Sequence, residues 1–342
     1  MRRAGDLNRG FKYTGGEIER TIMTRLENAY LTVQINELGA ELTGIYDKER
    51  GHETIWQANP EFWDRHAPIL FPFVGKVNGG YYRYKGRKYP MGQHGFARDL
   101  MFTLIRCTDT SATYDLVSNE KTREVYPMDF DLRITYILDD NVLTVQWDVF
   151  NPSSDEPLYF SIGGHPGFNV PILPGTVKND YFVLFEQEGM GGEEFEPASH
   201  LRYILIDPET AGADADNVRM LDLSGGRRRD TEDGRVVPQL APGMLKLTEH
   251  MFDNDALIFD GSQITRASIL YPDRTPYVRL TCRDFPSFGL WSKSAKAPFV
   301  CLEPWIGRVD NKGFDGELKD RFEEQKLDPL GHFHREYSIE ID

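Results

Sequence analysis

Apolar and polar residues alternate with a period of two along much of this chain. Leu31, Val33 and Ile35 are separated by polar residues, and the same pattern recurs at 143–149 and 278–282. Such alternation is typical of β-strands that bury one face and expose the other. Turn-forming residues separate the apolar runs, among them the segments 78–80, 85–87, 139–141, 151–154 and 260–262. The pattern therefore predicts many short strands joined by tight turns.

Helical periodicity is scarce by comparison. Short helices are expected only at Pro60–Arg65, in the acidic stretch 192–196 and around 315–325. Many short strands with few short helices predict an all-β fold. At a length of 342 residues, the expectation is one large antiparallel β-sandwich.

Two segments depart from this pattern. Residues 1–22 are polar, rich in glycine and without periodicity, so they are expected to form a flexible N-terminal extension. Residues 23–342 are expected to form a single domain. Within that domain, the segment 188–240 is rich in glycine and charge, and its apolar runs are too short for a second core. Surface excursions are expected there.

The composition excludes several classes of partner. The chain carries 54 acidic and 39 basic residues, a formal net charge of −15. Because affinity for phosphate groups comes mostly from Lys and Arg, this balance argues against nucleic acid and anionic membranes. Cys107, Cys282 and Cys301 form no paired motif, which argues against a disulfide framework or a zinc ribbon. With no signal-peptide pattern and no run of about 20 apolar residues, a cytoplasmic location is expected.

Two histidines lie in segments rich in glycine. His94 belongs to the segment 93–99, and His165 belongs to Gly163-Gly164-His165-Pro166-Gly167. Glycines allow a ligand to approach the backbone closely, and Pro166 restricts His165 to an extended conformation. Each histidine also has a structural interpretation, as a hydrogen-bonded side chain at a turn.

A glutamate ends an apolar run near the C-terminus. Glu303 follows Phe299-Val300-Cys301-Leu302 and precedes Pro304-Trp305. Glutamate is rarely buried without a partner, so a general base is one interpretation and a salt-bridged strand end is the other. The Trp305 indole beside it is suited to stack on a sugar.

A further histidine pair lies at His332-Phe333-His334. On a strand, this spacing places both rings on one face, as in some metal sites. The sequence offers no nearby third ligand with suitable spacing, so the pair is interpreted as a surface feature. No nucleotide-binding, zinc-protease or serine-hydrolase motif is present.

Taken together, the motifs resemble those of the aldose 1-epimerase (galactose mutarotase-like) superfamily, and most closely its LacX-like branch. They occur in the family's order over about residues 27–340. The matching segments are 67–75, 94–99, 163–169, 252–259, 289–292 and 299–305. The resemblance implies a single β-supersandwich that binds a sugar in an open cleft on one sheet.

The implied reaction interconverts the α and β anomers of a free aldose without a cofactor or a metal. By resemblance, Glu303 is the general base that takes the proton from the C1 hydroxyl, and His165 is the general acid that protonates the ring oxygen. His94 matches a second histidine that hydrogen-bonds near these two oxygens. An imidazole and a desolvated carboxylate are suited to proton transfer near neutral pH.

Other residues are expected to bind the substrate. Asp255 resembles the acid that holds sugar hydroxyls, with Asp253 as the alternative alignment. Lys76 stands where many members carry arginine, and a lysine offers one mobile charge in place of a planar fork. Arg98 could bind a phosphorylated sugar.

Three alternatives to a mutarotase of free aldoses stay open. One is a carbohydrate-binding or sensing protein on the same fold without turnover, which the substitution at Lys76 and the unusual segment 188–240 favour. Another is a hexose-6-phosphate mutarotase. The third is a metal-dependent enzyme that uses His94, His165 and Glu303 as ligands.

Overall fold

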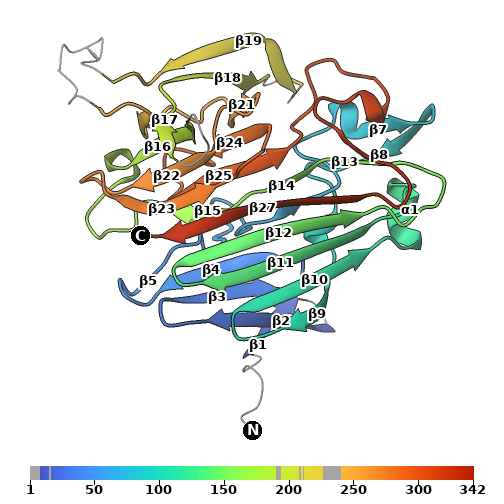
Figure 1. Ribbon diagram of the computed structural model, residues 1–342, viewed down its shortest axis with the longest axis horizontal. Coiled ribbons are helices and arrows are strands. Elements are labelled where there is room, and N and C mark those ends of the chain that lie inside the picture. Colours follow the sequence, from blue (N-terminus) through green and yellow to red (C-terminus); the bar gives the residue numbers. More distant parts are fainter. Residues whose placement is uncertain (1–7, 15–16, 190–193, 208, 211, 226–239) are drawn as a thin grey trace.

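The computed structural model describes residues 8–14, 17–189, 194–207, 209–210, 212–225 and 240–342. Strands account for 49% of the residues and helices for 6%, which confirms the all-β prediction. In the described part of the chain, the strands of each sheet pair in antiparallel orientation (Figure 1).

The largest described sheet has ten strands. Its order is β17 (Phe195–Pro197), β16 (Phe182–Glu188), β22 (Arg266–Leu270), β23 (Pro276–Thr281), β27 (His332–Ile341), β12 (Val142–Phe150), β11 (Asp131–Asp139), β10 (Ser111–Val117) and β9 (Thr103–Cys107), with β20 (Met244–Lys246) also paired to β16.

The second large sheet, as described, has eight strands. Its order is β19 (Ala213–Asp222), β18 (His200–Ile206), β21 (Leu257–Asp260), β24 (Ser287–Trp291), β25 (Phe299–Ile306), β14 (Ile162–Gly164) and β6 (Ile69–Leu70), with β15 (Gly167–Asn169) also paired to β25.

Smaller sheets complete the described fold. A five-stranded sheet contains β1 (Asn8–Thr14), β2 (Glu17–Glu27), β3 (Leu31–Asn36), β4 (Glu41–Asp47) and β5 (His52–Glu53). The hairpin of β7 (Tyr81–Tyr84) with β8 (Arg87–Pro90) is one two-stranded sheet, and the long-range pair of β13 (Leu158–Phe160) with β26 (Gln325–Leu327) is another.

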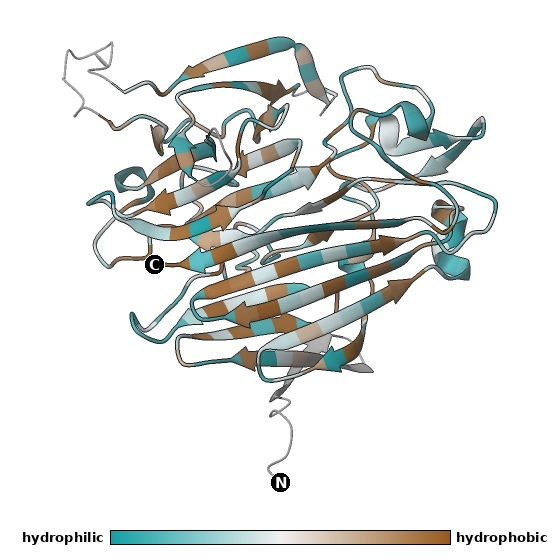
Figure 2. Cartoon of the chain, in the orientation of Figure 1, coloured by the Kyte–Doolittle hydropathy of each residue, from teal (hydrophilic) through white to brown (hydrophobic). Residues whose placement is uncertain are grey.

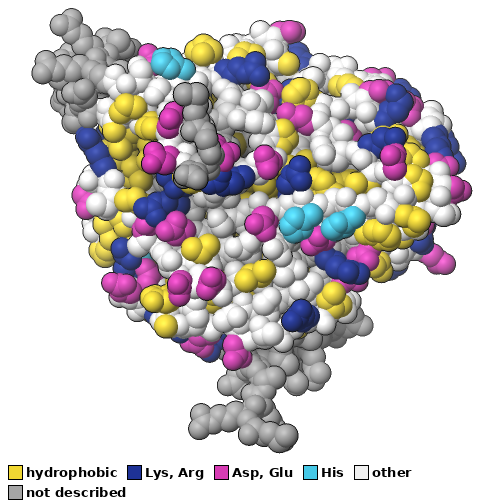
Figure 3. Space-filling model, in the orientation of Figure 1, with side chains coloured by type: hydrophobic (Ala, Val, Ile, Leu, Met, Phe, Trp, Pro, Cys, Tyr) yellow, Lys and Arg dark blue, Asp and Glu magenta, His cyan; other side chains and the backbone are white. Residues whose placement is uncertain are grey.

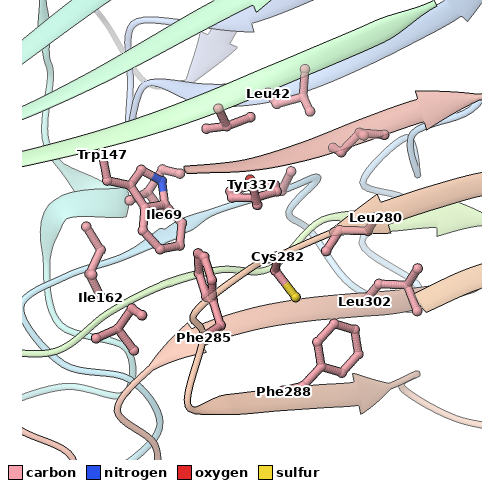
Figure 4. Packing of buried hydrophobic residues seen from close by; sticks show 14 of the residues in the cluster. Leu42, Ile69, Trp147, Ile162, Leu280, Cys282, Phe285, Phe288, Leu302 and Tyr337 are labelled. Atoms are coloured by element: carbon pink, nitrogen blue, oxygen red, sulfur yellow. The ribbon is translucent and has the colours of Figure 1, made fainter. Parts of the chain in front are cut away.

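The hydrophobic core lies between the two large sheets (Figure 4). Trp147, Leu280 and Tyr337 reach it from the ten-stranded sheet, and Phe288 and Leu302 reach it from the eight-stranded sheet. The period-two alternation is visible along the strands in Figure 2 and matches burial. In β12, for example, Leu143, Val145, Trp147 and Val149 are buried, and the residues between them are partly exposed. The sandwich prediction is confirmed.

The helix predictions are wrong in position. Pro60–Arg65 forms a single turn, in which the Asn59 carbonyl accepts hydrogen bonds from the Phe62 and Trp63 amides. The Trp63 carbonyl accepts a hydrogen bond from the Trp56 indole, so it is not available to continue a helix. Around 315–325 there is only a 3₁₀ turn at Leu318–Asp320. Of the stretch 192–196, residues 192–193 lie outside the described residues, and β17 begins at Phe195.

The short helix that does form, α1 (Glu120–Val125), was not expected. It begins with a capping box in which the Asn119 side chain accepts from the Thr122 amide and the Thr122 hydroxyl accepts from the Asn119 amide. Six residues are too few for a helical period to be visible in the sequence. Three further 3₁₀ turns occur at Asn78–Gly80, Ala97–Asp99 and Lys178–Asp180.

The segment 188–240 contributes strands to both large sheets. β18 and β19 extend the edge of the eight-stranded sheet, and β17 lies at the edge of the other. Its described part is thus continuous with the sandwich, whereas residues 190–193, 208, 211 and 226–239 lie outside the described residues. At the N-terminus, residues 1–7 and 15–16 also lie outside them, and a flexible extension over 1–22 stays a prediction.

Candidate active site

The strands β14 and β15 place His165 directly beside Glu303. Both strands pair with β25: Gly163 lies opposite Trp305 on one side of the interruption, and Gly167 lies opposite Cys301 on the other. Because the register is the same on both sides, His165 lies opposite Glu303. The Leu302 amide donates to the Pro166 carbonyl across the gap, at 3.3 Å.

The two side chains are in contact and shielded from solvent. His165 Nε2 lies 3.1 Å from Glu303 Oε2, and the Glu303 side chain is only 1% exposed. His165 Nδ1 and both carboxylate oxygens of Glu303 are buried, and none of these atoms has a hydrogen-bond partner among the described residues, so the 3.1 Å contact is a close approach rather than a formed hydrogen bond. Buried polar atoms are normally satisfied, so unpartnered ones at a contact of this kind indicate a ligand site.

Burial disfavours the charged form of both groups. It raises the pKa of Glu303 well above its usual range, and the negative charge of Asp255 raises it further. It lowers the pKa of His165 to about 3. Burial therefore favours a protonated carboxyl group next to a neutral imidazole.

His94 lies next to the pair, with its ring centroid 5.6 Å from that of His165. The backbone of Gly75 holds it twice: the His94 amide donates to the Gly75 carbonyl at 2.8 Å, and the Gly75 amide donates to His94 Nδ1 at 3.1 Å. Burial lowers the pKa of His94 well below its usual value. A neutral ring whose Nδ1 accepts carries its proton on Nε2, and this atom lies 3.2 Å from the side-chain amide of Gln93.

Aromatic rings that the sequence analysis did not single out enclose His165. Its ring centroid lies 4.8 Å from that of Trp63 and 5.5 Å from that of Trp291. Trp291 belongs to the quoted segment 289–292, but nothing in that segment indicated its contact with His165. Trp63 follows the turn at Asn59, so no local periodicity could have identified it.

Trp305 lies flat beside Glu303 because two glycines make room for it. A Cβ on Gly163 would lie 2.7 Å from Trp305 Cδ1, and one on Gly289 would lie 2.6 Å from Trp305 Cζ2. Gly289 is also the residue of β24 opposite Glu303. The Trp305 indole N–H lies near enough to Glu303 to oppose the rise in its pKa, yet it has no hydrogen-bond partner in the described structure.

The exposed acid next to the pair is Asp255, in the turn before β21. Its charge acts on Glu303, whereas Asp253 Oδ2 is 2.8 Å from His250 Nδ1 on the surface. Of the two alternative alignments, the structure therefore brings Asp255 to the site.

The two basic residues differ in their placement. Arg98 is partly buried and donates to the Gln93 carbonyl at 2.7 Å; its buried Nε has no hydrogen-bond partner and lies 3.9 Å from Asp99 Oδ2. Its charge contributes to the lowered pKa of both His94 and His165, so it belongs to the site. Lys76 is exposed and follows Gly75, and it forms no ion pair with the residues described.

The potential metal-binding side chains that lie close together differ from the set expected from the sequence. Among the described residues, the donor atoms of His165, Cys301 and Glu303 lie within 4.8 Å of one another, and His94 is not in this group. Cys301 faces the same side of β25 as Glu303, two residues away. Metal binding by His94, His165 and Glu303 together is therefore not supported.

Comparison with known proteins identifies the family of the chain. The family model for aldose 1-epimerase matches residues 23–312, and the chain belongs to this family. It is 30% identical to the chromosomal protein LacX of Lactococcus lactis subsp. lactis, over 92% of this chain and 98% of LacX. The resemblance to the LacX-like branch is thereby confirmed.

Solved structures agree with this assignment. A galactose mutarotase-related enzyme of Lactobacillus acidophilus superposes with a TM-score of 0.79 at 33% identity, over 94% of this chain and 97% of that one. A galactose mutarotase-like protein of Lactobacillus casei gives 0.78 at 29% identity, over 94% and 100%. No helix among the described residues is long and apolar enough to cross a membrane.

Proposed function

We propose that this protein is an aldose 1-epimerase that interconverts the α and β anomers of a free aldose, with Glu303 and His165 as its acid–base pair. The observation that carries the proposal is their 3.1 Å contact in a buried, aromatic-lined site, with His94 as a third polar group. The family assignment supports a mutarotase-like activity.

The short distance between Glu303 and His165 suits a reaction at the hemiacetal carbon of a sugar, C1. The C1 hydroxyl and the ring oxygen are bonded to the same carbon, so an acid and a base that act on both must themselves be neighbours. A sugar ring does not fit between two atoms 3.1 Å apart. We therefore place the C1 edge of the sugar over the pair, with its two oxygens facing Glu303 and His165.

The pair has the same protonation state before and after ring opening. Moving the shared proton from Glu303 to His165 gives a carboxylate and an imidazolium without any exchange with solvent. The carboxylate then takes the C1 hydroxyl proton as the carbonyl forms, while the imidazolium protonates the ring oxygen as its bond to C1 breaks. This leaves both groups neutral, the state that burial favours. Rotation about C1–C2 and the reverse steps form the other anomer.

The other site residues have supporting roles in this proposal. The His94 Nε2–H donates to an oxygen on C1, where charge changes during ring opening. Asp255 accepts hydrogen bonds from sugar hydroxyls. Trp305 and Trp291 offer ring faces to the apolar face of the sugar.

Polarimetry on freshly dissolved α-glucose and α-galactose tests the activity. The Glu303→Gln variant keeps the shape of the side chain and removes the base, so a loss of about 10²- to 10⁴-fold in the enzymatic rate is expected. Asp253→Asn is a matched control, because it removes a nearby carboxylate that is bonded to His250. Equal rates with and without the protein over a panel of aldoses would refute the proposal.

A binding protein without turnover is the second candidate, and the exposed Lys76 in place of a family arginine favours it. Saturable sugar binding in calorimetry without any rate enhancement would select it. A hexose-6-phosphate mutarotase is favoured by Arg98, whose buried Nε lacks a hydrogen-bond partner and has only a distant ion pair with Asp99 at 3.9 Å. A much higher kcat/KM for glucose 6-phosphate than for glucose, lost in Arg98→Met, would select that function. A cytoplasmic location and the lack of a nucleic-acid partner stay predictions.

A further inference from the structure

Lys178 is a buried lysine that the proposed mechanism does not use. It begins the 3₁₀ turn Lys178–Asp180 and is only 5% exposed. Figure 3 shows one face of the molecule, on which lysine and arginine side chains lie at the surface beside acidic ones. Lys178 has no carboxylate partner among the described residues, and burial lowers the pKa of its amine to about 8. Burying an unpaired cation is costly, so the contacts of this amine need a physical reason.

The amine holds the loop between β24 and β25. Lys178 Nζ donates to Ser292 Oγ and to the Ser294 carbonyl, each at 2.7 Å. The buried Ser292 hydroxyl in turn donates to the Phe299 carbonyl at 2.7 Å. Ser292 directly follows β24, and Phe299 is the first residue of β25. Lys178 therefore ties both ends of this loop to a segment outside the hairpin.

The same loop ends carry aromatic side chains of the candidate active site. Trp291, the last residue of β24, has its ring centroid 5.5 Å from that of His165 and 5.8 Å from that of Phe299. The Trp63 centroid lies 5.5 Å from both Trp291 and Phe299, and 4.8 Å from His165. Trp63, Trp291 and Phe299 thus form one packed cluster, the aromatic wall, that contacts the His165 ring.

We propose that Lys178 is a positioning residue that holds the aromatic wall against His165 through its hydrogen bonds to Ser292 and Ser294. The inference rests on the proposed function, because the wall matters for the reaction only if His165 transfers protons. A methionine could fill a similar volume without the cost of burying a charge. The contribution of the amine therefore lies in its hydrogen bonds.

The expected effect of the wall is to keep water away from His165. Burial is the main cause that lowers the pKa of this histidine. Titratable and charged groups also face it from several elements, namely Glu303, Cys301, His94, Arg98 and Arg65. None of these five groups is altered in a variant of Lys178. A change in the His165 pKa in such a variant therefore reports its exposure to water.

NMR titration of the His165 imidazole and the pH profile of kcat/KM, both on the full chain, test the proposal. In Lys178→Met, water should reach His165, so its pKa and the acidic limb of the profile should move up from about 3 by about one pH unit or more. At pH 7, kcat/KM should fall by about 10- to 100-fold, because small misplacements of site groups are costly. The His165 signal is identified by its absence in His165→Asn.

Two further variants separate the hydrogen bonds from the charge. Ser292→Ala keeps the lysine but removes its link to Phe299, so the pKa of His165 should rise in this variant as well. The double variant should shift this pKa no further than Lys178→Met alone, because both substitutions break one connection. Lys296→Met is the matched control, because Lys296 is an exposed lysine of the same loop. It should leave the His165 pKa and kcat/KM unchanged.

The inference and the proposed function fail in different ways. A wild-type chain without mutarotation activity refutes the proposed function, whereas the NMR titration still decides whether Lys178 holds the aromatic wall against His165. If Lys178→Met does not fold, Ser292→Ala decides alone. A His165 pKa that stays at its wild-type value in the folded variants overturns the inference, even where these variants are less stable or less active.

Discussion

At the scale of single residues, the central feature is a carboxyl group and an imidazole that lie 3.1 Å apart in a buried contact. Burial moves their pKa values in opposite directions, and the charge of Asp255 raises that of Glu303 further. In the proposed mechanism, the two groups can therefore exchange a proton over a pH range in which an isolated histidine would lose its charge. This property depends on the contact rather than on either residue type.

The first prediction is the pH profile of kcat/KM, which reports groups of the free enzyme. A second proton is added only when His165 titrates, at a pKa of about 3, and the shared proton is lost only at the raised pKa of Glu303. We therefore expect an acidic limb near pH 3 and an alkaline limb well above the usual pKa of glutamate. An acidic limb with its half-maximal point near 6.5, the usual value for histidine, would contradict this shared-proton model.

The second prediction concerns Asp255. Asp255→Asn should raise KM by about 10- to 100-fold, because hydrogen bonds to a charged group contribute about 1.5–3 kcal/mol. The Asp255 charge raises the pKa of Glu303, so its removal should also shift the alkaline limb of the profile to lower pH. Kinetics of Asp253→Asn provide the comparison, since Asp253 is engaged with His250. If both variants behave alike, Asp255 has no specific role.

At the scale of elements, the site depends on how β14, β15 and β24 flank the buried strand β25. All eight residues of β25 are buried, so both of its faces pack against other groups. The Trp305 indole of β25 lies against both neighbouring strands, and it fits there because each of these strands carries a glycine at the contact. The glycines quoted as motif residues therefore act through packing as much as through backbone flexibility.

The third prediction follows from this packing. Gly163→Ala should destabilise the fold by about 1–3 kcal/mol and reduce kcat, because the new methyl group would displace the Trp305 indole beside Glu303. Gly92→Ala is the control: it lies near His94, but its added Cβ would meet nothing within 4 Å. Urea unfolding and polarimetry measure the two effects. Wild-type behaviour of Gly163→Ala in both assays would refute the packing argument.

The same elements show what the sequence could predict. The alternating runs at 31–35, 143–149 and 278–282 lie in β3, β12 and β23, because each of these strands has one face in the core. The pairing of His165 with Glu303 came only from a resemblance, because the register of distant strands leaves no local pattern. Trp63 and the Lys178 neighbour of Ser292 were missed for the same reason.

At the scale of the whole molecule, a buried ionic network connects the end of β25 to the segment that holds His94. Arg321 Nε donates to Asp310 at 2.6 Å, and its Nη1 donates to Glu324 at 2.7 Å. Asp310 in turn accepts from the Asn78 amide at 3.0 Å, three residues beyond Gly75. No local sequence pattern indicates this network, because its members come from segments far apart in the chain.

The fourth prediction is that this network both stabilises the fold and positions His94. Arg321→Met leaves Asp310 and Glu324 buried without their cation, which typically costs about 3–5 kcal/mol. We expect a matching decrease in the free energy of unfolding in urea, and a lower kcat in the folded protein because Gly75 and His94 lose their support. Arg83→Met removes an exposed ion pair with Asp315, so it should change stability far less and leave kcat unchanged. If Arg321→Met is no less stable than Arg83→Met, the buried network does not hold this part of the fold together.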